Sequence, residues 1–133
     1  MSGPPELVKV ATPASMFRFS AVTWNAHRVH YDEPYATAVE GHEGLLVQAY
    51  LLASYLCEML MRWAGPQGRV VRLNYQVKAP VYAGTQIRCW GRPGPGGHAG
   101  ERDVVDLEIG IHVADRQVVQ GSAQVCRPAG QGR

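Results

Sequence analysis

The sequence predicts an α+β domain in which a curved antiparallel sheet wraps around one long helix. Two observations support this prediction. One long apolar segment without Gly or Pro lies near the middle of the chain, and several segments of alternating apolar and polar residues follow it. With 133 residues the chain has the length of one domain, so we expect residues 1–133 to share one core.

The first third of the chain carries loop signals and one strand signal. Residues 1–14 contain three prolines, and we expect a loose leader there. Residues 16–22 alternate between apolar and polar side chains, which predicts a strand or the approach to one. A polar cluster over residues 23–32 comes next, followed by a loop that extends to residue 44.

The helix is predicted over residues 45–63, which are rich in Leu, Ala, Met and Tyr and end before Gly65-Pro66. At 1.5 Å per residue it would be about 28 Å long. It is apolar on nearly every side as far as Glu58 and Arg62, and such a helix is normally buried. Because one sheet covers only one side of a helix, we expect a second subunit to cover the rest in a dimer.

Four segments of the second half alternate with period two, which is typical of half-buried strands in an antiparallel sheet. We predict these strands over residues 71–77, 85–92, 105–113 and 117–126. The segment 91–100 is rich in Gly and Pro and predicts a mobile loop. We expect residues 127–133 to form a loose tail.

Composition excludes several classes of function. The net charge is +2 and the basic residues are scattered, so we expect no nucleic-acid partner. Residues 49–57 are too short to cross a membrane, and residues 1–6 lack the apolar core of a signal peptide. Three widely spaced cysteines have neither metal-ligand nor redox spacing. We therefore expect reduced thiols, no metal and no cofactor in a cytoplasmic protein.

The densest group of polar side chains lies in residues 23–32 (TWNAHRVHYD). This segment holds two histidines, an asparagine and an aspartate, shortly before the apolar helix. A polar cluster beside a hydrophobic element is a common setting for a binding or catalytic pocket. We therefore place the candidate site in this segment.

Residues 17–32 (FRFSAVTWNAHRVHYD) resemble the hydratase signature of MaoC-like hot dog proteins. The similarity is to the branch that includes mesaconyl-CoA and itaconyl-CoA hydratases and the mitochondrial 3-hydroxyacyl-thioester dehydratase of yeast. Residues 34–36 (PYA) and 79–84 (APVYAG) are also similar to that branch, so the resemblance extends over residues 16–126. It implies a hot dog fold, in which an antiparallel sheet wraps a long central helix.

The resemblance also implies a reaction, the reversible addition of water to a 2-enoyl thioester of coenzyme A or acyl carrier protein. The wider family carries a catalytic aspartate and histidine five residues apart, and here Asn25 and His30 match those positions. We expect His30 to act as acid or base and Asn25 to position the water through its amide. The implied partners are the acyl thioester and a second hot dog chain, in a homodimer or a heterodimer.

The thioester oxygen needs hydrogen-bond donors as it gains negative charge. We expect the backbone N–H groups of Ala49 and Tyr50, at the start of the helix, to serve as those donors. Relatives usually carry a His-Gly pair here. This chain has Gln48-Ala49-Tyr50, which adds bulk where glycine lets the substrate approach. Further candidates for lining the pocket are Gln48, Ser54 and Trp24.

The polar residues of the cluster also have purely structural interpretations. His30 could be bonded to a backbone carbonyl, and Asn25 could cap the turn after the strand. His27 falls at a non-catalytic position of the motif, so we expect it in a loop or an interface. Asp32 is expected to cap a short helix through Tyr35 or to brace the loop, and orienting His30 is the lesser alternative.

Three other functions are compatible with the sequence. The chain could be a non-catalytic or half-catalytic subunit that works only beside another hot dog chain. It could be a hot dog thioesterase, since those enzymes usually place a carboxylate on or just before the central helix, where Glu40 and Glu43 occur. The third is a ligand-binding module without catalytic activity.

Overall fold

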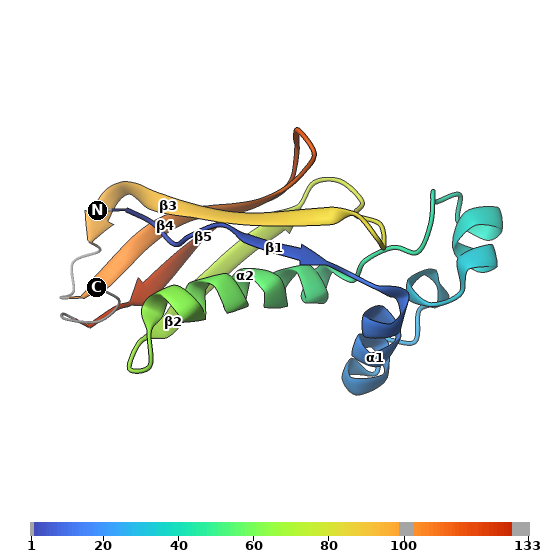
Figure 1. Ribbon diagram of the computed structural model, residues 1–133, viewed down its shortest axis with the longest axis horizontal. Coiled ribbons are helices and arrows are strands. Elements are labelled where there is room, and N and C mark those ends of the chain that lie inside the picture. The colour runs from blue at the N-terminus through green and yellow to red at the C-terminus, as the bar shows by residue number, and fades with distance from the viewer. Residues whose placement is uncertain (1, 99–102, 129–133) are drawn as a thin grey trace.

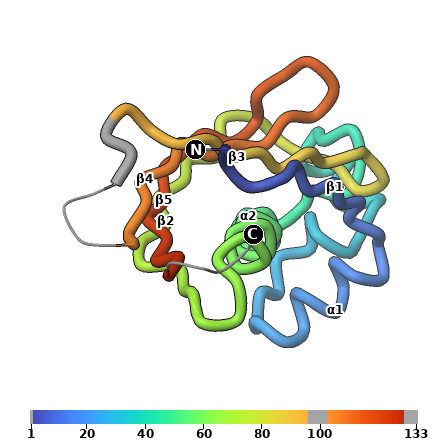
Figure 2. Tube along the Cα trace, turned by 60° about the vertical axis from the view of Figure 1, so that its left-hand side comes forward, coloured from blue at the N-terminus to red at the C-terminus, as the bar shows by residue number. Residues whose placement is uncertain are grey.

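The computed structural model describes residues 2–98 and 103–128. Within these residues a curved antiparallel sheet has the strand order β1-β3-β4-β5-β2. The strands are β1 (Leu7–Val10), β2 (Arg69–Val77), β3 (Gln86–His98), β4 (Val104–Val113) and β5 (Arg116–Cys126). The sheet curves around the long helix α2 (Ala49–Ala64), as a view close to the helix axis shows (Figure 2). The predicted architecture is therefore confirmed.

Helix α2 begins four residues later than the sequence predicts. The segment before it is extended, because Leu46 forms a β-bridge with Tyr82 and the Val47 N–H donates to the Val81 carbonyl at 2.8 Å. Gln48 then serves as the N-cap residue of the helix. Backbone pairing with the connection between β2 and β3 thus outweighs the helical preference of these apolar residues.

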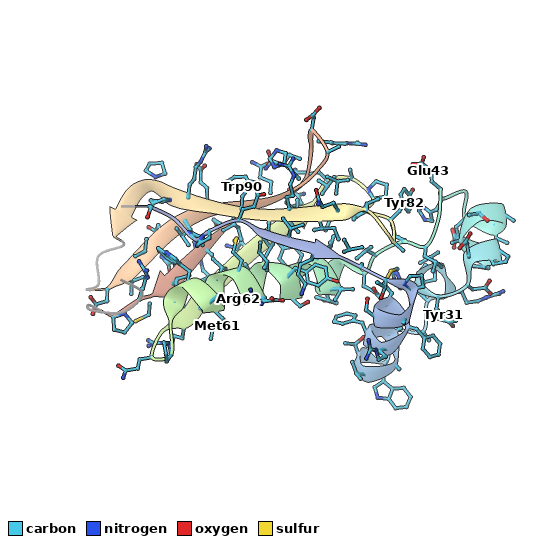
Figure 3. The ribbon with its side chains drawn as sticks, in the orientation of Figure 1. Tyr31, Glu43, Met61, Arg62, Tyr82 and Trp90 are labelled. Atoms are coloured by element: carbon cyan, nitrogen blue, oxygen red, sulfur yellow. The ribbon has the colours of Figure 1, made fainter. Side chains whose placement is uncertain are left out.

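One side of α2 forms the centre of the core. Leu52, Leu56 and Leu60 recur every four residues, are at most 1% exposed, and join one core cluster with apolar residues of β3, β4 and β5. Burying each such side chain stabilises the fold by about 1.5–3 kcal/mol. Met61 projects from α2 away from the sheet (Figure 3) and is 46% exposed, so that side of the helix is not covered by the sheet.

Residues 16–22, predicted as a strand, lie instead in helix α1 (Pro13–Thr23). The helix starts with a capping box in which the Ser15 N–H donates to Thr12 Oγ1 at 3.1 Å and the Thr12 N–H donates to Ser15 Oγ at 3.0 Å. Met16 and Ser20, four residues apart, are the buried members of the helix. This spacing is helical, so the strand prediction is wrong, and the capping signal outweighs a short alternation.

The loose leader predicted over residues 1–14 is wrong for most of its length. Strand β1 pairs antiparallel with β3, from Leu7 opposite Cys89 to Val10 opposite Gln86. The Lys9 ammonium also lies 3.1 Å from the Glu58 carboxylate of α2, so β1 is held to both the sheet and the helix.

The loop predicted over residues 91–100 is also wrong as far as residue 98. Strand β3 continues to His98 and pairs with β4 through Pro93 opposite Leu107, with a register shift before His98. Because β1 pairs only with residues 86–89, this part of β3 is an edge, where a proline removes no ladder hydrogen bond. Residues 99–102 lie outside the described residues.

The predicted strands over 71–77, 105–113 and 117–126 are confirmed as parts of β2, β4 and β5. The predicted tail lies largely outside the described residues, in 129–133. Arg127 is held in place, because its N–H donates to the Asp103 carbonyl at 2.8 Å and its Nε donates to the Trp63 carbonyl at 2.9 Å. No helix in the described part of the chain is long and apolar enough to span a membrane.

Candidate functional site

The candidate site lies at the end of the molecule where α2 begins. The chain between α1 and α2 gathers there and forms a 3₁₀ turn (Arg28–His30) and a π-helical turn (Tyr35–Val39) (Figure 1). A cavity of about 500 Å³ opens between this segment, the start of α2 and the connection after β2. Its polar wall consists of Asn25, His27, His30 and His42. The predicted pair, Asn25 and His30, therefore lines one cavity.

The end of α1 positions Asn25. Trp24 takes the left-handed conformation, with φ of 56°, and the Asn25 N–H then donates to the Ser20 carbonyl at 2.9 Å. This bonding pattern is a common way to end a helix. Asn25 Oδ1 also accepts a long hydrogen bond, 3.4 Å, from the His27 N–H. The asparagine thus caps the turn, while its side chain is part of the cavity wall.

His30 is buried, with 7% of its surface exposed. Its Nδ1 lies 2.6 Å from the Leu46 carbonyl oxygen, which can only accept a hydrogen bond. In the neutral ring Nδ1 therefore carries the hydrogen, and Nε2 keeps a free lone pair. Burial lowers the pKa of His30 below its ordinary value; the Leu46 hydrogen bond opposes this shift and the neighbouring His27 adds to it. His30 is suited to accept a proton at neutral pH.

The first residues of α2 form another wall of the cavity. Leu51 and Leu52 N–H groups donate to the Gln48 carbonyl at 3.0 and 3.1 Å, which begins the helical hydrogen bonding. Ala49 and Tyr50 precede them and both line the cavity. N–H groups in this first turn have no acceptor within their own helix, and the helix dipole favours negative charge beside them. This turn can therefore hold a negatively charged oxygen.

The other predicted pocket residues lie elsewhere. Gln48 is 1% exposed and points toward α1, where its Nε2 donates to the Met16 carbonyl at 2.8 Å and to Ser20 Oγ at 2.9 Å. Ser54 is exposed, and its hydroxyl donates to the Leu51 carbonyl of its own helix at 2.7 Å. Trp24 is 93% exposed and contributes to a separate pocket beside α1. These three residues do not line the cavity that holds His30.

Asp32 caps the following turn, as predicted. Its Oδ1 accepts from the Tyr35 N–H at 3.2 Å, and its Oδ2 lies 2.8 Å from Arg28 Nη2. The hydrogen bond from Arg28 holds the pKa of the Asp32 carboxyl below its usual value. Both carboxylate oxygens are thus engaged in bracing the loop.

Two further histidines line the cavity: His27, expected in a loop or an interface, and His42, which sequence reasoning missed. His42 Nδ1 lies 3.3 Å from the Tyr82 hydroxyl, 40 residues further along the chain, and Tyr82 lies at the same end of the molecule as Tyr31 and Glu43 (Figure 3). No spacing signal could have revealed His42. In the described residues, no group of three or more His, Cys, Asp or Glu side chains is arranged to hold a metal ion.

A five-stranded sheet curved around one central helix defines this chain as a hot dog fold protein. The (R)-hydratase from A. caviae involved in PHA biosynthesis has the same fold, with a TM-score of 0.85, 21% identity and 96% of each chain covered. The ChsH1-ChsH2 complex from Mycobacterium tuberculosis aligns with a TM-score of 0.81, 16% identity and 94% of each chain covered.

The chain belongs to the hydroxyacyl-thioester dehydratase type 2 family, whose model matches residues 6–83. It is 38% identical over 99 residues to mesaconyl-C(4)-CoA hydratase of Chloroflexus aurantiacus, covering 74% of this chain and 32% of that protein. It is 30% identical over 79 residues to the mitochondrial hydroxyacyl-thioester dehydratase type 2 of Schizosaccharomyces pombe, covering 58% of this chain and 26% of that protein. The chain spans about a third or less of the length of these curated relatives.

Proposed function

We propose that this chain interconverts 2-enoyl and 3-hydroxyacyl thioesters of coenzyme A or acyl carrier protein. One observation carries the proposal: Asn25 and His30, the motif pair, line one cavity together with the first turn of α2. Family membership supplies the reaction class, because its model is that of hydroxyacyl-thioester dehydratases. The geometry supports the proposal, because this reaction needs a base and hydrogen-bond donors, and a buried imidazole, an amide and the first turn of α2 meet at one cavity.

In the dehydration direction, His30 Nε2 removes the proton from C2 of the 3-hydroxyacyl thioester. The C–H electron pair forms the C2=C3 double bond, and the C3–O bond breaks with its electron pair on oxygen. The hydroxyl takes up a proton from an acid group of the site and leaves as water. Asn25 cannot exchange protons at ordinary pH, so its amide holds the hydroxyl or the water in place. The N–H groups of Ala49 and Tyr50 stabilise the charge that develops on the thioester oxygen. Hydration is the reverse.

The acyl group would occupy the apolar part of the cavity. Val29, Leu52, Val77 and Val81 contribute to its lining, and a volume of about 500 Å³ accommodates a small organic group. An apolar lining excludes water from the base, which strengthens the polar contacts inside the site.

A second hot dog unit would complete this cavity. Tyr50 and Val77 both line the cavity, yet Tyr50 is 71% exposed and Val77 is also exposed. Met61 and Val71 extend the uncovered apolar surface along α2 and β2. We propose that a partner covers this face, as a second copy or as a different hot dog chain. Light scattering of the pure chain, alone and after co-expression with candidate chains, would separate the two.

The test of the reaction is an assay of enoyl absorbance with crotonyl and 3-hydroxyacyl thioesters of several chain lengths. We expect the His30→Ala variant to lose about 10²–10⁴-fold in rate, the usual contribution of a positioned acid or base. His112→Ala, a histidine of β4 outside the cavity, should keep wild-type activity. If wild type and His30→Ala are equally inert, the proposal is refuted.

The same assay separates hydration from thioester hydrolysis. Glu40 and Glu43, the carboxylates that a thioesterase would use, do not line the cavity. We therefore expect no free thiol to appear with a saturated acyl thioester. Release of thiol without an enoyl signal would favour the thioesterase alternative.

A further inference from the structure

We propose that His27 is a second proton-transferring residue of this site, the general acid that protonates the departing hydroxyl while His30 acts as the base. The inference rests on the proposed function, because it assigns a further role in the same reaction. It departs from the motif, in which His27 occupies a position without a catalytic role.

The contacts of His27 place it beside the base. Its ring meets the His30 ring edge to face, with 5.8 Å between the ring centroids and an interplanar angle of 86°. Both rings line the cavity. His27 Nε2 lies 3.5 Å from Glu40 Oε1, and that oxygen also accepts a hydrogen bond from the Tyr35 hydroxyl at 3.1 Å. Tyr35 thus holds the carboxylate in place beside the His27 ring.

The departing hydroxyl needs a proton. Either a second group donates it, or His30 returns the proton that it took from C2. Asn25, at the position of a carboxyl group in the wider family, cannot donate it. The two histidines differ in the way that separates an acid from a base. His30 is buried against a backbone carbonyl, whereas the side chain of His27 is 56% exposed and lies beside Glu40. The geometry therefore assigns the base to His30 and the acid to His27.

The dehydration step then balances without any further reactant. His30 Nε2 takes the C2 proton, and the C–H electron pair becomes the second bond between C2 and C3. The C3–O electron pair moves to oxygen, which accepts a proton from the His27 imidazolium and leaves as water. The cycle ends with His30 charged and His27 neutral. After the product leaves, His30 gives its proton to water that enters the cavity, and His27 regains one from water at its exposed side.

The charged and titratable groups around His27 are few. Glu40 and Tyr35 belong to the π-helical turn and its end, and His30 lies on the same 3₁₀ turn. Arg28, the next residue, is paired with Asp32 at 2.8 Å. His42 lines the cavity as well and is bonded to the Tyr82 hydroxyl. Within residues 2–98 and 103–128, Glu40 is thus the anion in contact with the His27 ring.

The test is the pH profile of kcat for dehydration in wild type, His27→Gln, Glu40→Gln and His112→Gln. We expect a bell in wild type, because His30 must be neutral and His27 must be charged. His27→Gln should lose about 10²-fold in kcat with little change in KM, and it should lose the alkaline limb. Glu40→Gln still accepts a hydrogen bond from Tyr35 but removes the charge beside His27, so its kcat should fall with little change in KM. His112→Gln should match wild type.

The possible results separate this assignment from the proposed function. Suppose that wild type is active, and that His27→Gln keeps the bell-shaped pH profile or has a kcat within twofold of wild type. That result overturns the role of His27 and leaves the proposed reaction intact. A His27→Gln variant that loses activity but keeps both limbs also overturns it, since His27 would then only position other groups. A wild-type chain that forms no enoyl thioester overturns the proposed function itself, and this role with it.

Discussion

Replacing Gln48 by methionine tests how the end of α1 is attached to the start of α2. Methionine has nearly the length of glutamine but cannot donate a hydrogen bond. The Gln48 amide donates at 2.8 Å to the Met16 carbonyl and at 2.9 Å to the Ser20 hydroxyl, and its Oε1 is buried without a partner among the described residues. The substitution removes both donors and the unpaired oxygen together.

The magnitude follows from these contacts. Two hydrogen bonds at about 1 kcal/mol each stabilise the fold by about 2 kcal/mol. Removing the buried, unpaired Oε1 offsets this loss by about 1 kcal/mol at most. The Ser20 hydroxyl can turn to a carbonyl of its own helix, which limits the damage further. We expect Gln48→Met to lower the free energy of unfolding by about 1–2 kcal/mol.

Gln48→Glu keeps the shape but presents carboxylate oxygens to the same carbonyl and hydroxyl. A buried, uncompensated charge typically costs about 3–5 kcal/mol, so this variant should be the less stable of the two. Burial raises the pKa of such a carboxyl. The folded state therefore binds a proton more readily than the unfolded state, and the deficit should shrink as the pH falls.

Urea unfolding at constant m-value measures these differences. Gln76→Met, on the exposed face of β2, is the control and should change stability by less than about 0.5 kcal/mol. If Gln48→Met is as stable as wild type, or if Gln48→Glu is no worse than Gln48→Met, then the Gln48 hydrogen bonds do not hold α1 in place.

Three further changes test other parts of the structure. Burial lowers the pKa of His30 below 6.5, so the stability that neutral His30 contributes is present above that pH and is lost as the pH falls below it. The free energy of unfolding, measured with urea, should therefore decline less steeply with falling pH in His30→Gln than in wild type. Gly121→Ala would push a methyl group into the Asn74 backbone of the neighbouring strand. The free energy of unfolding, derived from thermal melting, should fall by about 3 kcal/mol. Burial raises the pKa of the Cys89 thiol to about 12, so a thiol reagent at mildly alkaline pH should modify Cys89 only after unfolding.

The sequence predicts the elements whose patterns are long. Helix α2 and strands β2, β4 and β5 show sustained periods, and the structure contains all of them. Strand β1 has only four residues, LVKV, between prolines and Thr12, and so short a segment carries almost no period. The strand prediction for α1 is wrong because the alternation after Met16 covers few residues, whereas Thr12 and Ser15 encode the start of the helix locally.

The candidate site divides in the same way. Asn25, His30 and the start of α2 could be placed from one motif and from the position of the long helix. The partners of Gln48 lie 28 and 32 residues away, and they depend on how α1 packs against α2. Spacing along the chain cannot reveal such contacts, because tertiary packing decides which distant groups meet. The contact between His27 and Glu40 is hidden for the same reason.

Helix α1 lies beyond the end of the sheet (Figure 1). It is hydrogen-bonded to the buried side-chain amide of Gln48, the N-cap residue of α2. A local opening that undocks α1 would therefore displace Asn25 at one end and disturb the first turn of α2 at the other. Such sub-global openings require less free energy than unfolding of the whole sheet. Activity should accordingly disappear at lower denaturant than the circular-dichroism signal of the strands. The residues that line the cavity and those of α1 would exchange their amide hydrogens as one cooperative unit, before the residues of the core.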